Sequence, residues 1–138
     1  MVHITTSWRG VAVVVAFALI IVAAVAYFLI RPADLGTRTV QAGEVEVKMT
    51  ALTLDVSGAA FKIEFNTHTV ELSLDPASAA RLTVNGTSAD GATWDGQGPG
   101  GHHREGTLRF PAPIPSGASV ELSITGLPQD ANAAWSAP

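Results

Sequence analysis

The chain has 138 residues, of which 47% are hydrophobic and 14% are charged, and its formal net charge is −4 at pH 7. It contains no cysteine, which excludes a disulfide framework and thiolate metal sites. From Arg38 onward, six Lys and Arg stand against eleven Asp and Glu, a net charge of −5, so nucleic acid and anionic lipid headgroups are not expected as partners.

Residues 11–30 form the first predicted element, a run without a charge, an amide, a glycine or a proline. A helix of this length spans about 30 Å, the thickness of the hydrocarbon core of a bilayer. Residues 1–10 are then a short tail, and Trp8 and Tyr27 are expected at the two membrane interfaces. We therefore expect a single-pass transmembrane helix in a bacterial cell membrane, in contact with other integral membrane subunits.

A cleaved signal peptide is the alternative, because Ala24-Val25-Ala26 has the small-x-small form of a cleavage site. The apolar run continues four residues beyond it, which favours an uncleaved signal-anchor. Positive charges do not decide the orientation, since Arg9 precedes the run and Arg31 and Arg38 follow it. Because long folded segments translocate largely without regard to charge, the C-terminal domain is expected on the extracytoplasmic, periplasmic side.

Residues 31–43 are polar and rich in turn-forming residues, which predicts a linker. Residues 44–138 then form one domain, in which apolar and polar residues alternate with the period of a β-strand. The phase of this alternation slips after Ala51, so that Leu52, Leu54 and Val56 are expected to point inward after a β-bulge. Further strands are expected at residues 61–65, 70–74, 82–84, 108–110, 120–124 and 133–136.

These short strands, separated by turn signals such as Asn85-Gly86, predict an all-β fold. An antiparallel β-sandwich of the immunoglobulin-like kind fits their number and spacing, with Trp135 of the last strand pointing inward. No helical pattern of useful length follows residue 30.

The stretch from Trp94 to Phe110 carries the candidate site. Gly96, Gly98 and Gly101 match a dinucleotide-binding fingerprint, but a strand pattern follows them instead of the helix that such a site requires. The dinucleotide interpretation is therefore excluded.

Three histidines of the domain, His68, His102 and His103, could bind copper or zinc, because imidazole is a common ligand of both metals. On an extended strand, His102 and His103 would point to opposite faces, so at most one of them joins His68 unless the glycines bend the backbone there. The alternative is structural: the glycines form a tight loop, Trp94 plugs the end of the sandwich, and a histidine packs on Trp94 or bonds a backbone carbonyl.

Arg104 and Glu105 follow the histidines and are expected as either a surface ion pair worth under about 1 kcal/mol or a recognition element. Together with Trp94 they are the candidate contact residues of the domain. The sequence contains no G-x-S-x-G, no P-loop and no H-E-x-x-H, so neither catalysis nor a bound cofactor is expected.

Residues 65–72 and 94–111 contain NTHTV, WDG and GGHHREGTLRF. They resemble uncharacterised bacterial membrane-anchored extracytoplasmic domains with the pattern NTH[ST]V, WxG and GGHHRxGxLxF. The resemblance covers about residues 44–135 and leaves out the apolar segment. It implies an immunoglobulin-like sandwich with His68, His102 and His103 at one end, and it implies no activity.

The function expected from these features is that of a non-enzymatic, single-span accessory or structural subunit of a larger membrane complex, of the respiratory or photosynthetic kind. The sandwich would contact extracytoplasmic protein surfaces. The alternative is a membrane-anchored copper or zinc binding protein or metallochaperone that uses His68, His102 and His103.

Overall fold

The computed structural model describes residues 8–30 and 35–138, and within the first segment it describes the side chains of residues 12–23. The chain divides into two compact units, Met1–Ala33 and Asp34–Pro138. The helices and strands are α1 (Trp8–Ile30), β1 (Thr37–Ala42), β2 (Val45–Asp55), β3 (Gly58–Asn66), α2 (Pro76–Ala79), β4 (Ala80–Val84), β5 (Thr87–Ala89), β6 (Thr93–Gly96), β7 (His103–Phe110), β8 (Ser119–Ile124) and β9 (Ala131–Ser136).

The apolar segment forms helix α1. Its large apolar side chains from Val13 to Val22 are all at least 52% exposed. Within the described residues, no helix combines the length and the apolar character that crossing a membrane requires. The predicted transmembrane helix over residues 11–30 therefore finds no support in the structure.

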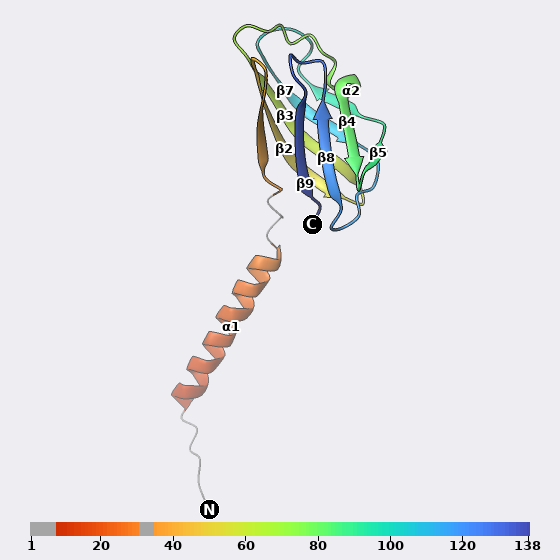
Figure 1. Cartoon of the computed structure of the whole chain (residues 1–138). Helices are drawn as coiled ribbons and strands as arrows, with labels where there is room; N and C mark the ends of the chain where they lie inside the picture. The colour runs from red at the N-terminus through yellow and green to blue at the C-terminus, as the bar shows by residue number, and fades with distance from the viewer. Residues whose placement is uncertain (1–7, 31–34) are drawn as a thin grey trace, which may run out of the picture. The chain divides into compact units, whose positions relative to one another are not determined.

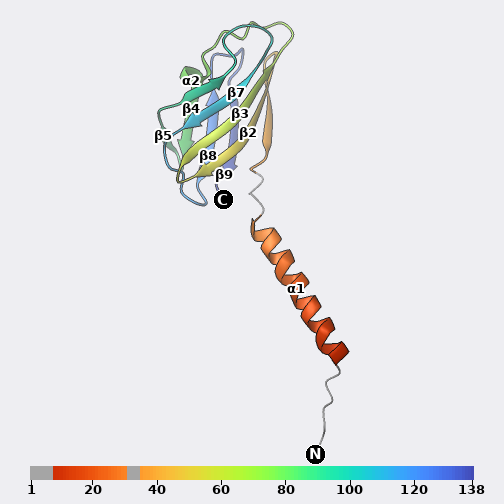
Figure 2. The same ribbon diagram turned by 180° about the vertical axis from the view of Figure 1, so that it is seen from behind.

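The second unit consists of two antiparallel sheets that face each other (Figures 1 and 2), which confirms the predicted all-β sandwich. The first sheet has the order β1-β2-β3-β7-β6 and the second the order β5-β4-β8-β9. Strand β1 lies within the stretch expected to be a linker, residues 31–43. Its first three residues are exposed and polar, so this edge strand lacks the alternation that marks the others.

The predicted bulge in β2 is present, because the register between β2 and β3 shifts between Ala51 and Thr53. Beyond the shift, Leu54 is buried as expected, but Leu52 and Val56 are 52% and 81% exposed. The inward orientation predicted for these two residues is wrong. Leu52 is the extra residue of the bulge, and Val56 lies in the turn after β2.

The hairpin of β4 and β5 confirms the turn predicted at Asn85-Gly86, where both residues have positive φ angles of 49° and 81°. The strand predicted over residues 70–74 is absent. Leu72 is fully buried there, and its N–H and C=O groups form backbone hydrogen bonds to a neighbouring loop. The sequence also missed α2, a single helical turn.

The core lies between the sheets and is built from the inward residues of both. Trp135 is 4% exposed and packs on Phe61, with 5.1 Å between ring centroids, which confirms its predicted inward position. Its Nε1 donates to the carbonyl oxygen of Gly36 at 3.1 Å, and Nε of Arg38 donates to the carbonyl oxygen of Ala134 at 3.3 Å. These bonds join the β1 edge of one sheet to the β9 edge of the other.

Asp75 caps α2 by accepting hydrogen bonds from the Ala77 N–H and the Ser78 hydroxyl. The bond from Ser78 lowers the pKa of Asp75, and bonds from Ser57 lower the pKa of Asp55 in the same way. Carboxylates with lowered pKa values stabilise the fold at neutral pH, and this contribution is lost as the pH falls through the folded-state pKa.

We therefore expect the urea concentration at the unfolding midpoint of residues 34–138 to decrease when the pH is lowered below about 4, the usual pKa range of aspartate. A double Asp55→Asn, Asp75→Asn variant should show a smaller fall. An identical pH profile in this variant would contradict the assignment of the effect to these two carboxylates.

Candidate functional site

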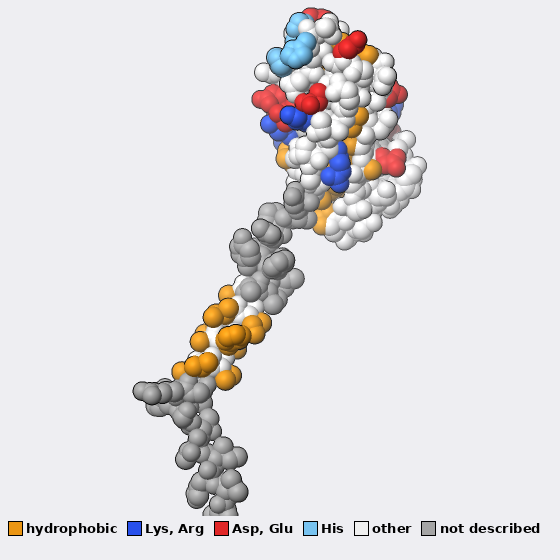
Figure 3. Space-filling view, turned by 60° about the vertical axis from the view of Figure 1, so that its left-hand side comes forward, with side chains coloured by type: hydrophobic (Ala, Val, Ile, Leu, Met, Phe, Trp, Pro, Cys, Tyr) orange, Lys and Arg blue, Asp and Glu red, His pale blue; other side chains and the backbone are white. Residues whose placement is uncertain are grey.

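Four connections meet at one end of the sandwich (Figure 1), where Figure 3 shows histidine side chains at the surface. The side chains of His68, His102 and His103 are all exposed. The connections are residues 43–44, 67–75, 97–102 and 125–130. We term this the histidine end. The opposite end, which carries the β2–β3 and β4–β5 turns, is termed the hairpin end.

Backbone hydrogen bonds join two loops of the histidine end, residues 67–75 and 97–102. The Thr67 N–H donates to the His102 carbonyl at 2.9 Å, and the Leu72 N–H donates to the Gly101 carbonyl at 3.0 Å. The Gly100 N–H donates to the Leu72 carbonyl at 2.8 Å. Gly100 and Gly101 have φ angles of 111° and 75°, which favour glycine. The two loops are thus held together as a pair.

The side chain of Arg104 joins the same two loops on the inner face of the first sheet. It lies opposite Phe65 in the sheet and points to the same inner face, so that it is only 4% exposed. Its Nε donates to the Gln97 carbonyl at 2.9 Å, and its Nη1 donates to the carbonyls of Leu72, at 3.2 Å, and Leu74. One guanidinium group therefore connects residues 72–74 to residue 97.

Burial lowers the pKa of Arg104, while the negative charge of Asp75 opposes this change. An arginine side chain stays protonated in proteins, so the buried group is a cation held by carbonyl dipoles. The predicted surface ion pair between Arg104 and Glu105 is wrong, because adjacent residues of a strand point to opposite faces. Glu105 is exposed and pairs instead with Lys62, at 3.6 Å.

Trp94 closes the core at the histidine end, as predicted. Its ring packs against the core and lies 6.4 Å from the ring of Phe65, and its Nε1 donates to the Gln97 carbonyl at 3.0 Å. The guanidinium of Arg104 lies 5.7 Å from the centroid of the Trp94 ring, a cation–π distance. The prediction placed a histidine against this ring or on a carbonyl, but the residue found there is Arg104.

Two glycines make room for the ring of Trp94. Gly96 and Gly106 face each other across β6 and β7. A Cβ atom on Gly96 would lie 2.8 Å from Cζ2 of Trp94, and one on Gly106 would lie 2.6 Å from the same atom. Gly96 and Gly106 therefore serve packing, whereas a Cβ on Gly98 or Gly101 would meet no atom within 4 Å.

The histidines divide between two places. His68 and His103 line a surface hollow of about 260 Å³ together with Glu44 and Glu46, and Nδ1 of His103 lies 2.9 Å from Oδ1 of Asn66. The side chain of His102 is exposed and does not line this hollow. The prediction that at most one of the adjacent pair would join His68 is confirmed.

Within the part of the chain that the structure describes, no group of three or more His, Cys, Asp or Glu residues is placed to hold a metal ion. The predicted copper or zinc site of His68, His102 and His103 is therefore not supported, because His102 does not line the hollow that His68 and His103 share. The two other candidate contact residues, Trp8 and Tyr27, lie outside the residues whose side chains are described.

No protein-family model matches the chain, and no curated protein or solved structure matches it. The functional interpretation therefore depends on the geometry of the described residues and on the sequence itself.

Proposed function

We propose that the chain is a non-enzymatic subunit of a larger membrane complex, in which the β-sandwich binds a partner protein through its histidine end. The observation that carries this proposal is the fixed shape of the two long loops, which Arg104 and the backbone bonds around Leu72 hold together. A binding surface with a preformed backbone loses little conformational entropy when a partner binds. Exposed imidazoles and glycine backbone on such a surface suit polar recognition.

We also infer that the sandwich is of the immunoglobulin-like kind. Strands β2-β3-β7-β6 follow the order A-B-E-D, and β5-β4-β8-β9 follow the order C′-C-F-G, with β1 added beside β2. In this alignment, residues 67–79, which include α2, are the B–C connection and residues 125–130 are the F–G loop. Variable immunoglobulin domains bind their ligands through these loops, which supports the histidine end as the contact surface.

Attachment to a membrane is the second part of the proposal. It rests on the uninterrupted apolar run of residues 11–30 and on the exposure of large apolar side chains along α1. A contiguous exposed apolar surface as long as this run marks a site of contact with lipid or with another protein. The extracytoplasmic location of the sandwich follows from the signal-anchor interpretation of the same run.

An alkaline carbonate wash of membranes tests the attachment by itself. The full chain should stay in the membrane pellet, as integral proteins do. A Val15→Lys, Leu19→Lys variant should be released, because each charge in the apolar run costs about 3 kcal/mol in the membrane. Release of the unmodified chain would contradict the attachment, while leaving the contact surface untested by this wash.

Purification of the full chain from its native membranes in a mild nonionic detergent tests the contact surface. A stoichiometric partner should copurify with the unmodified chain and be lost from a His68→Glu, His102→Glu variant, since both side chains are exposed and carry no core contacts. An Arg81→Glu variant on the outer face of the second sheet is the control and should retain the partner. A partner-free monomer, or equal loss in both variants, would contradict the proposal.

A further inference from the structure

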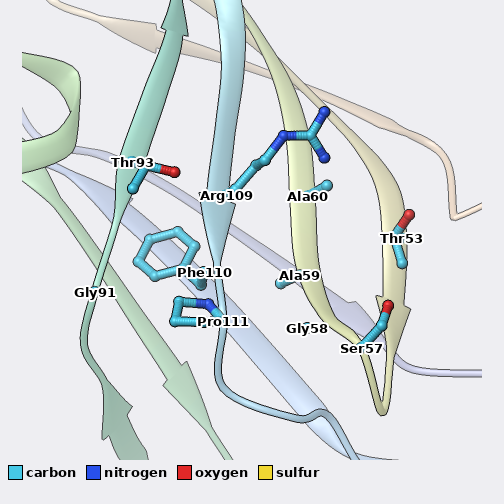
Figure 4. Close-up of a pocket in the computed structure, with 10 residues that line it drawn as sticks. All are labelled: Thr53, Ser57, Gly58, Ala59, Ala60, Gly91, Thr93, Arg109, Phe110 and Pro111. Carbon is cyan, nitrogen blue, oxygen red and sulfur yellow. The ribbon is translucent and has the colours of Figure 1, made fainter.

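A second hollow, of about 320 Å³, opens at the hairpin end, on the outer face of the first sheet (Figure 4). Its lining residues include Thr53, Gly58, Ala60, Thr93, Arg109 and Pro111. It lies at the other end of the sandwich from the histidines, so inferences about it do not depend on the contact surface proposed above.

The hollow follows from the register of four neighbouring strands. Thr53 pairs with Ala60, Ala60 pairs with Arg109, and Arg109 pairs with Thr93, so these residues form one row across β2, β3, β7 and β6. Ala60 is the short member of the row and is only 5% exposed, although it belongs to the outer face. Figure 4 shows the guanidinium of Arg109 beside Ala60, with Thr93 on one side and Thr53 on the other.

Arg109 is an exposed cation, and no hydrogen bond or ion pair joins its side chain to another described residue. The lysines of the same face differ, because Lys48 pairs with Glu46 and Lys62 pairs with Glu64, each at 3.5 Å. The residues lining the hollow include no carboxylate. Asp55, the last residue of β2, already accepts hydrogen bonds from the Ser57 N–H and hydroxyl at 2.7 and 2.5 Å.

We propose that this hollow binds the carboxylate of an acidic side chain from a peptide segment of a partner protein. The planar guanidinium group presents two parallel N–H donors, which match the two oxygens of a carboxylate. The hydroxyl groups of Thr53 and Thr93 flank that position and supply further donors. Pro111 adds an apolar wall for the methylene groups of the acidic side chain.

The charge of the domain favours a single carboxylate over a polyanion. One guanidinium group lies in the hollow, and the sequence from Arg38 onward has a net charge of −5. Nucleic acids and anionic membrane surfaces require a broad basic face, which this composition does not provide.

An NMR titration tests the proposal on the full, ¹⁵N-labelled chain in maltoside micelles. The probes are the peptides acetyl-Ala-Glu-Ala-amide and acetyl-Ala-Gln-Ala-amide, which differ only in the carboxylate. The glutamate peptide should shift the amide resonances of Thr53, Ala60 and Thr93 and the Nε–H resonance of Arg109 in a saturable way. The glutamine peptide should bind at least about tenfold more weakly, a factor worth about 1.4 kcal/mol.

Variants locate the binding. Arg109→Gln should weaken the glutamate peptide about tenfold or more, and Arg109→Lys should fall between, because lysine keeps the charge but loses the forked geometry. Arg81→Gln is the matched control, since Arg81 is also exposed and lines a hollow on the other sheet, where Glu121 is a neighbour. A spectrum that otherwise overlays that of the unmodified chain shows that each variant is folded.

Three results would overturn the proposal. They are equal shifts with the two peptides, equal weakening by Arg109→Gln and Arg81→Gln, and tighter binding of inorganic phosphate than of the glutamate peptide. The last result would make the hollow a phosphate site. Saturable shifts confined to the hollow and dependent on both the carboxylate and Arg109 would support it.

Discussion

Replacing Arg104 with alanine is expected to lower the free energy of unfolding of the sandwich by about 2–4 kcal/mol. The substitution removes a buried cation together with the three hydrogen bonds that it donates. The carbonyls of Leu72, Leu74 and Gln97 then lose this donor. It also removes the group that covers the Trp94 ring. Urea unfolding of residues 34–138, followed by tryptophan fluorescence, measures the change.

Two further variants separate the causes. Arg104→Lys keeps the charge but cannot reach carbonyls on both loops with one nitrogen, so it should recover only part of the lost stability. Arg109→Ala, on the opposite face of the same strand, removes an exposed arginine and should change stability by less than about 0.5 kcal/mol. If Arg104→Ala were as mild as Arg109→Ala, the loops would not depend on the guanidinium.

Replacing Gly106 with alanine is expected to cost a similar amount, about 2–4 kcal/mol, through steric overlap. The new Cβ would lie 2.6 Å from both Cα of Gly96 and Cζ2 of Trp94, and 2.8 Å from the carbonyl oxygen of Asp95. Two of these neighbours are backbone atoms of the paired strand, so relief requires the sheet to open or the ring to leave its place. Lower urea stability together with altered Trp94 fluorescence would report this.

Gly98→Ala is the matched control for the same glycine-rich stretch. A Cβ at Gly98 would have no atom within 4 Å, and its φ angle is not in the left-handed region. This variant should therefore change stability by less than about 0.5 kcal/mol. If both alanine variants were equally costly, general loss of loop flexibility, and not the space under Trp94, would explain the glycines.

The stability losses expected for Arg104→Ala and Gly106→Ala make these two variants unsuitable for the binding experiments. Arg104 and Gly106 support the histidine end from within, so changing them alters both the stability and the shape of the proposed contact surface. Only exposed positions such as His68 and His102 can test recognition without this ambiguity. The same reasoning makes Arg109, which is exposed, a suitable probe of the second hollow.

Much of the sandwich was predictable from the sequence. Alternation with a period of two identified β2, β3, β7 and β8, and the phase slip after Ala51 predicted the bulge that the register confirms. The same alternation, extended backward from Phe110 and Leu108, puts Gly106 and Arg104 on the inner face. That signal was available, but charge made Arg104 look like a surface residue.

Local patterns could not predict contacts made by loops. Leu72 alternates with its neighbours as in a strand, yet its backbone bonds to Gly100 and Gly101, almost thirty residues later. The row of Thr53, Ala60, Arg109 and Thr93 is likewise invisible in the sequence, because four separate strands contribute to it.

The sequence by itself determined the apolar run of residues 11–30, the strand-forming character of the second unit and the inward position of Trp135. Each of these depends on the polarity of residues that are neighbours along the chain. The tertiary structure alone decided that Arg104 is buried, that the three histidines do not converge and that Arg109 lies in a hollow whose described lining residues include no carboxylate. These depend on register and loop contacts between distant segments, which only the packed sheets bring together.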